Sequence, residues 1–255
     1  MSGELSPHEW HNRYLQQAQW TRDLRRYLYS RVSLETSQHI LDIGCGTGVL
    51  EVELEGLCCA TLFGLDINST SLELAMRNTQ RTSFTQGDAH QIPYPSHSFD
   101  ISMCHFLLLW VANPLCVVAE MARVTRPGGA VLALAEPDYG GRIDHPAGLA
   151  ALGPRQSESL RLQGADPLMG RKLAGIFHQA GLQDIESGVL GGQWSGNPTE
   201  EAWNIEWQVL ENDLDRPGVE TPDLQVLKEL DWAAWQRGDR VLYVPTFYAL
   251  GVNPA

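Results

Sequence analysis

The stretch LDIGCGTG, residues 41–48, decides the fold of this chain. It completes a short apolar run over residues 39–45, which predicts a buried β-strand, and it leads into a predicted helix over residues 48–57. Three glycines between a strand and a helix allow positive φ angles and a close approach of the backbone to a ligand. At the carboxyl end of the first strand of a doubly wound sheet, such a turn forms the floor of a nucleotide site.

The spacing of these glycines, Gly44, Gly46 and Gly48, is GxGxG. A dinucleotide-binding turn has the spacing GxGxxG, and Val49 stands where its third glycine would be. A glycine-rich turn is weakly specific when it stands alone, and an ordinary strand-to-helix turn is the other interpretation. The neighbouring segments therefore carry the argument.

Outward from this turn the chain alternates between strands and helices. Strands are predicted over residues 61–67, 83–89, 99–106 and 130–137, and helices over residues 71–80 and 114–124. Ser69 or Thr70 is available as the N-cap of the first of these helices, and Pro114 begins the second. This alternation predicts right-handed βαβ units and a parallel sheet that is covered on both faces.

The two ends of the chain show weaker patterns. Residues 8–30 have the spacing of one amphipathic helix, and residues 171–182 predict another. Residues 183–194 and 240–252 predict strands, the second with a bulge or an edge position at Pro245. Between them, residues 198–238 predict a helical segment that contains Trp203, Trp207, Trp232 and Trp235. A small satellite core is the favoured interpretation of these tryptophans, and a cofactor-sensing role is the alternative.

Two further strand ends point to the same site as the glycine turn. Asp66 ends the second predicted strand, 22 positions after Gly44, where a carboxylate can accept both hydroxyls of an adenosine ribose. Asp88, in Gly87-Asp88-Ala89, ends the third, where a side chain can reach the adenine amino group. A helix cap for Asp66 and a turn for Asp88 are the alternatives. Because the carboxyl ends of parallel strands meet at one edge, the three elements converge.

With these motifs the chain resembles the class I S-adenosylmethionine-dependent methyltransferases. The resemblance is to their small-molecule branch, related to enzymes of ubiquinone and menaquinone biosynthesis and with a methyltransferase type 11-like domain. Four segments carry it: LDIGCGTG, GLDIN at 64–68, GDAHQIPYPSHSFD at 87–100, and RVTRPGGAVLALAEP at 123–137. The match spans about residues 38–137 and is specific for cofactor binding, whereas it says little about the methyl acceptor.

The resemblance implies an α/β fold. This is a Rossmann-like, doubly wound, seven-stranded and mostly parallel sheet of order 3-2-1-4-5-7-6 with helices on both faces. It implies one methyltransferase domain over residues 1–255, in which residues 1–37 form an N-terminal helical cap and residues 38–137 the cofactor-binding core. Residues 138–255 would form the substrate-side half, with a helical insertion at about 198–238 over the rim of the site.

S-adenosylmethionine is the cofactor that the resemblance implies. The residues assigned to it are Tyr14, Asp42, Gly44, Cys45, Gly46, Gly48, Asp66, Ile67, Asp88, Ala89 and Cys104. Asp42 lies in a predicted buried strand, where an unpaired carboxylate is costly. In the family the matching residue organises the glycine loop and the methionine end of the cofactor. Tyr14 and Trp20 have two interpretations, packing or covering the cofactor.

The expected reaction is in-line transfer of the sulfonium methyl group to a small molecule. A hydroxyl or a protonated amine requires a base, for which His105 and Tyr139 are the candidates, whereas a thiolate or a neutral amine requires none. His105 has a structural or substrate-positioning role as its alternative, and a turn is the alternative for the segment that contains Tyr139. Arg142 and His145 lie in the same loop after the fifth predicted strand.

Two other function classes remain open from the sequence. One is a cofactor-binding protein of this fold without transferase activity, with a regulatory or assembly role. The other is a nicotinamide-dependent oxidoreductase, which the missing third glycine and the absence of a Tyr-x-x-x-Lys pair oppose. Turnover of the cofactor in the presence of acceptors would separate these classes.

Composition excludes several partners. The formal net charge of −13 disfavours nucleic acid and anionic membrane surfaces. The five cysteines are odd in number and form no CxxC pair, which indicates reduced thiols and no structural metal. No signal peptide is evident and no apolar run is long enough to span a bilayer, so a soluble cytoplasmic enzyme is expected. The acceptor and the oligomeric state stay open.

Overall fold

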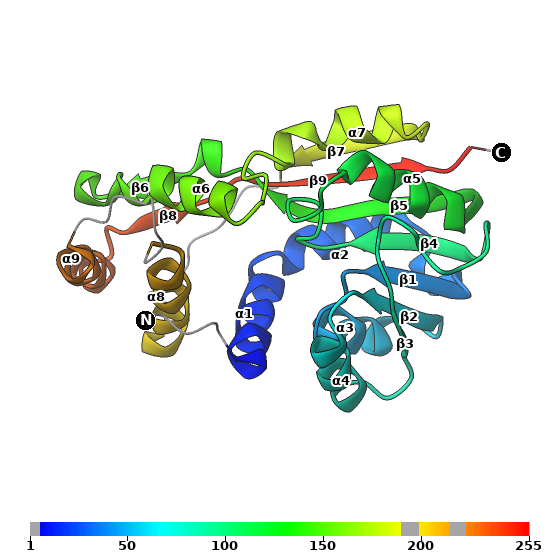
Figure 1. Ribbon diagram of the computed structural model, residues 1–255, viewed down its shortest axis with the longest axis horizontal. Helices are drawn as coiled ribbons and strands as arrows, with labels where there is room; N and C mark the ends of the chain where they lie inside the picture. The colour runs from blue at the N-terminus through cyan, green and yellow to red at the C-terminus, as the bar shows by residue number, and fades with distance from the viewer. Residues whose placement is uncertain (1–5, 190–198, 215–222, 255) are drawn as a thin grey trace.

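The computed structural model describes residues 6–189, 199–214 and 223–254, and a seven-stranded sheet is its centre (Figure 1). The strands are β1 (His39–Ile43), β2 (Thr61–Asp66), β3 (Ser83–Gln86), β4 (Phe99–Cys104), β5 (Thr125–Pro137), β7 (Gln183–Val189) and β9 (Thr246–Val252). Their order is β3-β2-β1-β4-β5-β9-β7, in which β9 is antiparallel to both of its neighbours and the other pairs are parallel.

The expected fold class is confirmed, and the strand numbers differ in one detail. A short strand that the sequence did not predict, β6 (Ile143–His145), forms a separate antiparallel pair with β8 (Val241–Tyr243), the first part of the strand expected over residues 240–252. The last two strands of the main sheet are therefore numbered β7 and β9 along the chain. When only the strands of the main sheet are counted, the order is 3-2-1-4-5-7-6.

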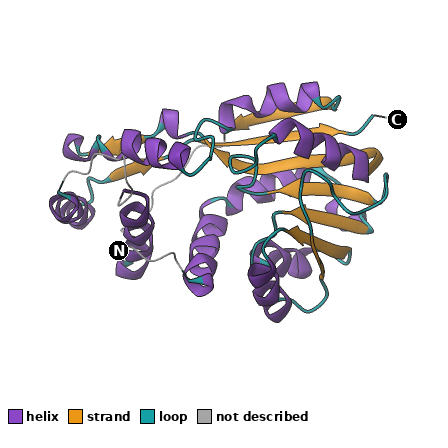
Figure 2. Ribbon diagram, in the orientation of Figure 1, coloured by secondary structure: helices purple, strands orange, loops and turns teal. Residues whose placement is uncertain are grey.

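Helices cover both faces of the main sheet (Figure 2). One face packs against α5 (Pro114–Val124) and α7 (Leu173–Gln179), and the other against α2 (Arg22–Arg31) and α3 (Val49–Leu57). Successive residues of β1 enter the two different cores, Leu41 on one side and Ile40 on the other. Burial on both faces explains why this strand is a continuous apolar run.

The remaining helices lie at the edges of this core. They are α1 (Pro7–Trp20), α4 (Ser69–Asn78), α6 (Leu152–Leu162), α8 (Glu200–Leu214) and α9 (Leu224–Arg237), with short 3₁₀ turns η1 (Leu34–Thr36), η2 (Tyr139–Gly141), η3 (Ala147–Leu149) and η4 (Gly170–Lys172). The helix α1 contacts both α3 and α8, so it lies between the main sheet and the part of the molecule that contains β6 and β8 (Figure 1).

A satellite core forms around Trp207, which is fully buried on α8. It packs with Leu149, Leu152, Leu210, Leu214 and Leu227, and Trp203 packs against this cluster. The Trp203 ring also lies 4.8 Å from the ring of Trp232 on α9. The interpretation as a small core is therefore confirmed for Trp203 and Trp207, and Trp232 touches it through Trp203, whereas for Trp235 it stays a prediction. Residues 215–222 of the predicted helical segment lie outside the described residues.

Three predicted elements were wrong in detail. The expected helix over residues 8–30 breaks at Thr21, whose hydroxyl donates to the Gln17 carbonyl at 2.9 Å. The N-cap of α4 is Asn68, whose side chain accepts from the Ser71 backbone, and not Ser69 or Thr70. The expected strand over 240–252 is divided into β8 and β9 on either side of Pro245, because proline has no N–H to continue a ladder.

Among the described residues, no helix combines the length and the hydropathy needed to cross a lipid bilayer.

Candidate cofactor and acceptor site

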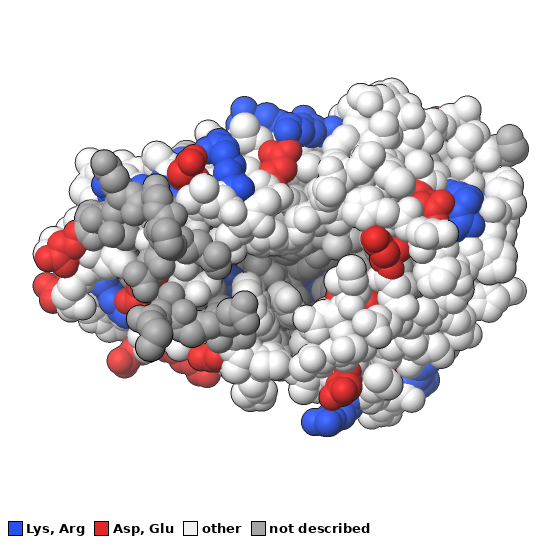
Figure 3. Space-filling model, viewed as in Figure 1, with Lys and Arg blue, Asp and Glu red and all other residues white. Residues whose placement is uncertain are grey.

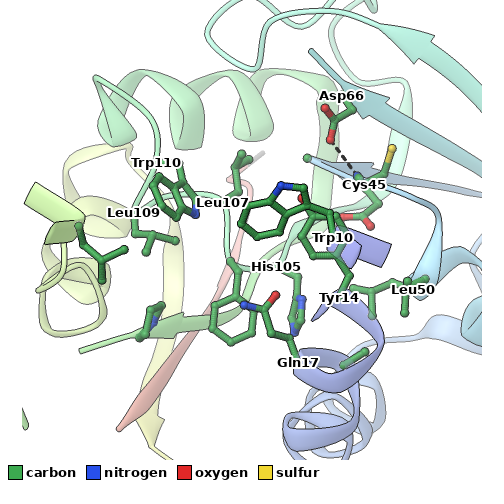
Figure 4. Close-up of a pocket in the computed structure, with 18 of the residues that line it drawn as sticks. Trp10, Tyr14, Gln17, Cys45, Leu50, Asp66, His105, Leu107, Leu109 and Trp110 are labelled. Atoms are coloured by element: carbon green, nitrogen blue, oxygen red, sulfur yellow. Dashed lines mark hydrogen bonds between the residues drawn. The ribbon is translucent and has the colours of Figure 1, made fainter. Parts of the chain in front are cut away.

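A cavity of about 400 Å³ opens at the carboxyl ends of β1, β2, β4 and β5 (Figure 4). It is lined by Trp10, Tyr14, Gln17, Ala18, Asp42, Gly44, Cys45, Gly46, Val49, Leu50, Asp66, His105, Phe106, Leu107, Leu109, Trp110, Pro137, Tyr139, Leu160 and Gln163. In the space-filling view the surface is hollowed near its centre, and mostly uncharged atoms surround the hollow (Figure 3). The volume is typical of a small-molecule site.

The glycine turn forms one wall of this cavity and has no room for side chains. The φ angles of Gly44 and Gly46 are 74° and 54°, in the left-handed region that favours glycine. A Cβ on Gly44 would lie 2.8 Å from the Leu107 side chain, and one on Gly46 would lie 3.1 Å from the Tyr14 ring. The turn is therefore a bare backbone surface between two side chains that themselves line the cavity.

Asp66 is held in place by backbone donors. Its Oδ2 accepts from the Gly46 N–H at 2.8 Å, drawn as a dashed line in Figure 4, and its Oδ1 accepts from the Asn68 N–H at 2.8 Å. Because each carboxylate oxygen has two lone pairs, both oxygens can accept a further hydrogen bond. A fixed carboxylate with free lone pairs at the cavity wall suits a pair of hydroxyl groups.

Asp42 and Glu51 form a buried carboxyl pair beside the turn, and Asp42 also lines the cavity. Within the part of the chain that the structure describes, Asp42 Oδ1 and both Glu51 oxygens have no hydrogen-bond partner. Burial raises the pKa of each carboxyl. The negative charge of Asp42 raises the pKa of Glu51 further. The sequence argument missed Glu51, although an acidic residue on the apolar face of a predicted helix is a signal.

His105 follows β4 and lies in the cavity as a neutral imidazole. Burial, with a smaller effect of the Arg25 charge, lowers the pKa of His105 to about 3. Its Nε2 lies 2.8 Å from Thr21 Oγ1, which also accepts from Arg25 Nη1 at 2.7 Å. The break between α1 and α2 thus places a hydroxyl against the imidazole. Such a weak base suits positioning better than proton removal.

Tyr139 also lines the cavity, and burial raises the pKa of its phenol to about 12. Its hydroxyl therefore stays protonated at neutral pH. Both catalytic candidates from the sequence thus line one cavity in an uncharged state, and their role in catalysis stays a prediction.

Glu136 anchors the loop that carries His105. Its buried carboxylate accepts from the backbone N–H groups of Leu107, Leu108 and Leu109 at 2.9, 2.7 and 3.2 Å. Burial raises its pKa to about 7, and these hydrogen bonds oppose that effect. Three backbone donors on one side chain hold the loop between β4 and Trp110, which forms the far wall of the cavity.

Some of the expected cofactor residues do not line the cavity. Gly48 is the N-cap of α3, Ile67 is 69% exposed, and Cys104 is fully buried beneath the site. Asp88 accepts from the backbone and the ring of His90, which lowers the pKa of its carboxyl. Ala89 packs against the core. These residues stand at or under the carboxyl edge of the sheet, and their assignment stays a prediction.

Other residues of the site had no signal in the sequence. Gln17, Leu160 and Gln163 line the cavity from α1 and from the end of α6, outside every motif. Arg142 lies outside the lining, because it is buried against Asp144 at 2.7 Å. Within the described segments, no group of three His, Cys, Asp or Glu side chains could hold a metal ion.

Comparisons with known proteins agree with this geometry. The family described as "Methyltransferase domain" matches residues 41–133. A demethylmenaquinone methyltransferase of Bacillus licheniformis is 32% identical over 164 residues, which are 57% of this chain and 71% of that protein. The methyltransferase GfsG of Streptomyces halstedii is 33% identical over 126 residues, 47% of this chain and 45% of that protein. The chain thus spans about half the length of some relatives.

Solved structures share the fold. The putative methyltransferase of Haloferax volcanii, solved with the Trm112 methyltransferase activator, has a TM-score of 0.63 and 17% identity over 98% of this chain and 96% of that chain. A phosphoethanolamine N-methyltransferase of Haemonchus contortus has a TM-score of 0.60 and 17% identity over 94% of this chain and 57% of that chain. With the glycine turn, Asp66 and the sheet order, these findings confirm the resemblance: the chain belongs to the family of class I methyltransferases, whose cofactor is S-adenosylmethionine.

Proposed function

We propose that this protein transfers a methyl group from S-adenosylmethionine to a small molecule by in-line displacement. The observation that carries the proposal is the single cavity that joins the glycine turn and Asp66 to His105, Trp110 and Tyr139. Figure 4 shows Cys45 and Asp66 at one end of it and Leu109 and Trp110 at the other. A cofactor bound at one end and an acceptor bound at the other would meet near the middle, where His105 lies.

The cofactor end fits the chemistry of S-adenosylmethionine. Asp66 has free lone pairs for the ribose hydroxyls, and next to it the backbone of Gly44 and Gly46 forms a cavity wall without side chains of its own. Asp42 Oδ1 is buried and lacks a donor among the described residues, and the ammonium group of the methionine end would supply one. When bound, the cofactor supplies an electrophilic methyl group on a sulfonium.

The acceptor end would align the nucleophile and exclude water. Trp110, Leu109 and Leu160 give it apolar walls, and a cavity of this size favours a small acceptor over a polypeptide. His105, with its pKa of about 3, would hold the acceptor by a hydrogen bond and not take its proton. Alignment of two bound reactants accounts for much of the rate in such a displacement.

The substrates of similar proteins cannot be assigned directly to this one. The Haemonchus contortus enzyme was solved with phosphomonomethylethanolamine, which carries a phosphate. Among the described residues that line this cavity there is no Lys or Arg, and the Arg13 and Arg142 charges that act on Tyr139 are paired with Glu206 and Asp144, so an anionic acceptor would face no counter-charge from them. An uncharged acceptor fits the lining better.

The test has two stages. Calorimetric titration should show binding of S-adenosylmethionine and S-adenosylhomocysteine, with much weaker binding of NADH and NADPH. The protein is then incubated with S-adenosylmethionine and a panel of phenols, amines and thiols, and S-adenosylhomocysteine is measured by chromatography. Tighter NAD(P)H binding would overturn the proposal, and cofactor binding without turnover on any acceptor would favour a protein without transferase activity. The turnover stage is necessary because one solved structure with a similar fold is named as a [4+2]-cyclase and not as a methyltransferase.

A further inference from the structure

A chain of hydrogen bonds reaches the acceptor end of the cavity from a buried guanidinium. Arg142 donates through Nε and Nη2 to Asp144, at 2.7 and 3.1 Å, and through Nη1 to Gln156 Oε1. A guanidinium has donors only. The Gln156 amide is therefore oriented with its oxygen toward Arg142 and its nitrogen away from it.

The series of hydrogen bonds continues from Gln156 through Asp213 to Gln163. Gln156 Nε2 donates to Asp213 Oδ2 at 2.9 Å, and Gln163 Nε2 donates to Asp213 Oδ1 at 3.0 Å and to Ser159 Oγ at 3.3 Å. A carboxylate only accepts, so Gln163 must point its nitrogen at Asp213. With both protons of Nε2 engaged by Asp213 and Ser159, the carbonyl oxygen is the amide atom of Gln163 that is left to accept from a ligand in the cavity that this residue lines.

The surroundings of this oxygen are apolar or uncharged. Leu160 and Trp110 line the same cavity, and Tyr139 keeps its hydroxyl proton. Of the residues that the structure describes, no Lys or Arg lines the cavity, and the nearby Arg13 and Arg142 are paired with Glu206 and Asp144. A carboxylate or phosphate on the acceptor would meet the Gln163 oxygen without a counter-charge. An O–H or N–H group would meet an acceptor whose direction is fixed before binding.

We propose that the oriented Gln163 carbonyl selects an uncharged acceptor that carries an O–H or N–H donor on an apolar body. The proposal rests on the proposed function, because it takes this cavity to be the acceptor site. Gln163 acts as a specificity residue for recognition and takes no part in the transfer itself. A ligand with such a donor should bind about three- to tenfold more tightly than a matched ligand without it, which is the net effect of one hydrogen bond.

Four probes of similar shape test the proposal on the protein saturated with S-adenosylhomocysteine. They are 2-naphthol for the O–H group, indole for the N–H group, 2-methoxynaphthalene without a donor, and 2-naphthoate as an anion. Dissociation constants come from ligand-observed NMR titrations. Naphthol, indole or both should bind more tightly than 2-methoxynaphthalene, by the factor given above, and 2-naphthoate most weakly. The comparison of naphthol with indole identifies the donor.

Three variants locate the effect. Gln163→Leu should bind naphthol and 2-methoxynaphthalene equally well. Asp213→Asn introduces an amide that can donate to Gln163 Oε1, so the Gln163 amide can reverse and the preference for donors should fall. Gln208→Leu makes the same substitution at an exposed site on α8 and should leave the preference unchanged. Circular dichroism and thermal unfolding establish that each variant is folded.

Two sets of results overturn the inference. In the wild type these are equal binding of naphthol and 2-methoxynaphthalene, tighter binding of 2-naphthoate, or no binding of naphthol and indole. In a folded Gln163→Leu variant it is an undiminished preference for donors. Failure of the proposed function appears separately, as absent S-adenosylhomocysteine binding in the calorimetric titration.

Discussion

Asp66 is the side chain on which ribose recognition should depend. Loss of charge-assisted hydrogen bonds costs about 1.5–3 kcal/mol each, so Asp66→Ala should weaken S-adenosylhomocysteine binding about tenfold or more. Calorimetric titration measures the change, with Asp23→Ala at an exposed position on α2 as the comparison. Unchanged affinity in a folded Asp66→Ala variant would place the ribose contact elsewhere.

The buried pair of Asp42 and Glu51 should make stability fall as pH rises. Burial raises the pKa of both carboxyls, so the folded state holds protons that the unfolded state releases above the ordinary values of 3.8 and 4.5. For each group, the free energy of unfolding falls by about 1.4 kcal/mol per pH unit between its pKa in the unfolded state and its pKa in the folded state. Stability from this pair is thus complete at low pH and lost as pH rises.

Glu51→Gln replaces one of the two titrating groups with an amide that does not titrate. Urea unfolding at pH 5 and pH 8.5 should show a smaller loss of stability in the variant than in the wild type. Glu73→Gln, at an exposed position on α4, is the control and should behave like the wild type. Equal pH dependence of Glu51→Gln and the wild type would mean that Glu51 is ionised in the folded protein.

His105 should not titrate in the range where enzymes of this kind are assayed. Its pKa of about 3 predicts no inflection from this residue in the pH profile of turnover between pH 5 and 8. His105→Gln retains a neutral hydrogen-bonding side chain and should keep more turnover than His105→Ala, at equal cofactor affinity. An inflection near 6.5 in the wild type that is absent from both variants would instead identify a general base.

At the scale of elements, hydrogen bonds connect the satellite core to the acceptor end of the cavity. Trp207 is fully buried and donates to Asp231 Oδ2 at 2.8 Å, and Asp231 in turn accepts from Arg240 Nε at 2.5 Å. Arg240 donates to Asp144 at 2.8 Å, and Asp144 also binds Arg142. The core under α8 and α9 is thereby connected to the hydrogen bonds that orient Gln163.

Trp207→Ala should therefore separate transfer from cofactor binding. Truncation of a buried tryptophan costs about 3–5 kcal/mol, here in the satellite core and not under the glycine turn. Turnover should fall at least tenfold while S-adenosylhomocysteine affinity stays within about twofold. Val226→Ala on the exposed side of α9 is the control. Normal turnover in a folded Trp207→Ala variant would show that this core has only a structural role.

For the whole molecule, ligand binding should appear as added stability. A ligand at 100 times its dissociation constant adds about 2.7 kcal/mol to the free energy of unfolding. For a chain of this size, that corresponds to an increase in Tm of about 5–10 °C. Thermal unfolding should show it with S-adenosylhomocysteine, whereas NADH at equal concentration should leave Tm nearly unchanged. The reverse pattern would contradict the cofactor assignment.

Much of this architecture was predictable because it depends on neighbours in the chain. The LDIGCGTG turn, the apolar runs of β1 and β5 and the acidic end of β2 are local patterns, and parallel strands place their carboxyl ends together by topology. Glu51 and Glu136 were missed because a single charged residue in an apolar segment does not reveal what it binds. The split at Pro245 was missed because the strand pattern continues on both sides of it.

The sequence by itself therefore determined the sheet, the glycine turn, Asp66 and the cofactor class, since each follows from short-range spacing. Only the tertiary structure decided the acceptor end. It brings Thr21 against His105, 84 residues away along the chain, and Asp213 against Gln163, 50 residues away. Burial and the Arg25 charge keep the imidazole of His105 neutral, and Asp213 sets the direction of the Gln163 amide; no local pattern contains this burial or these partners.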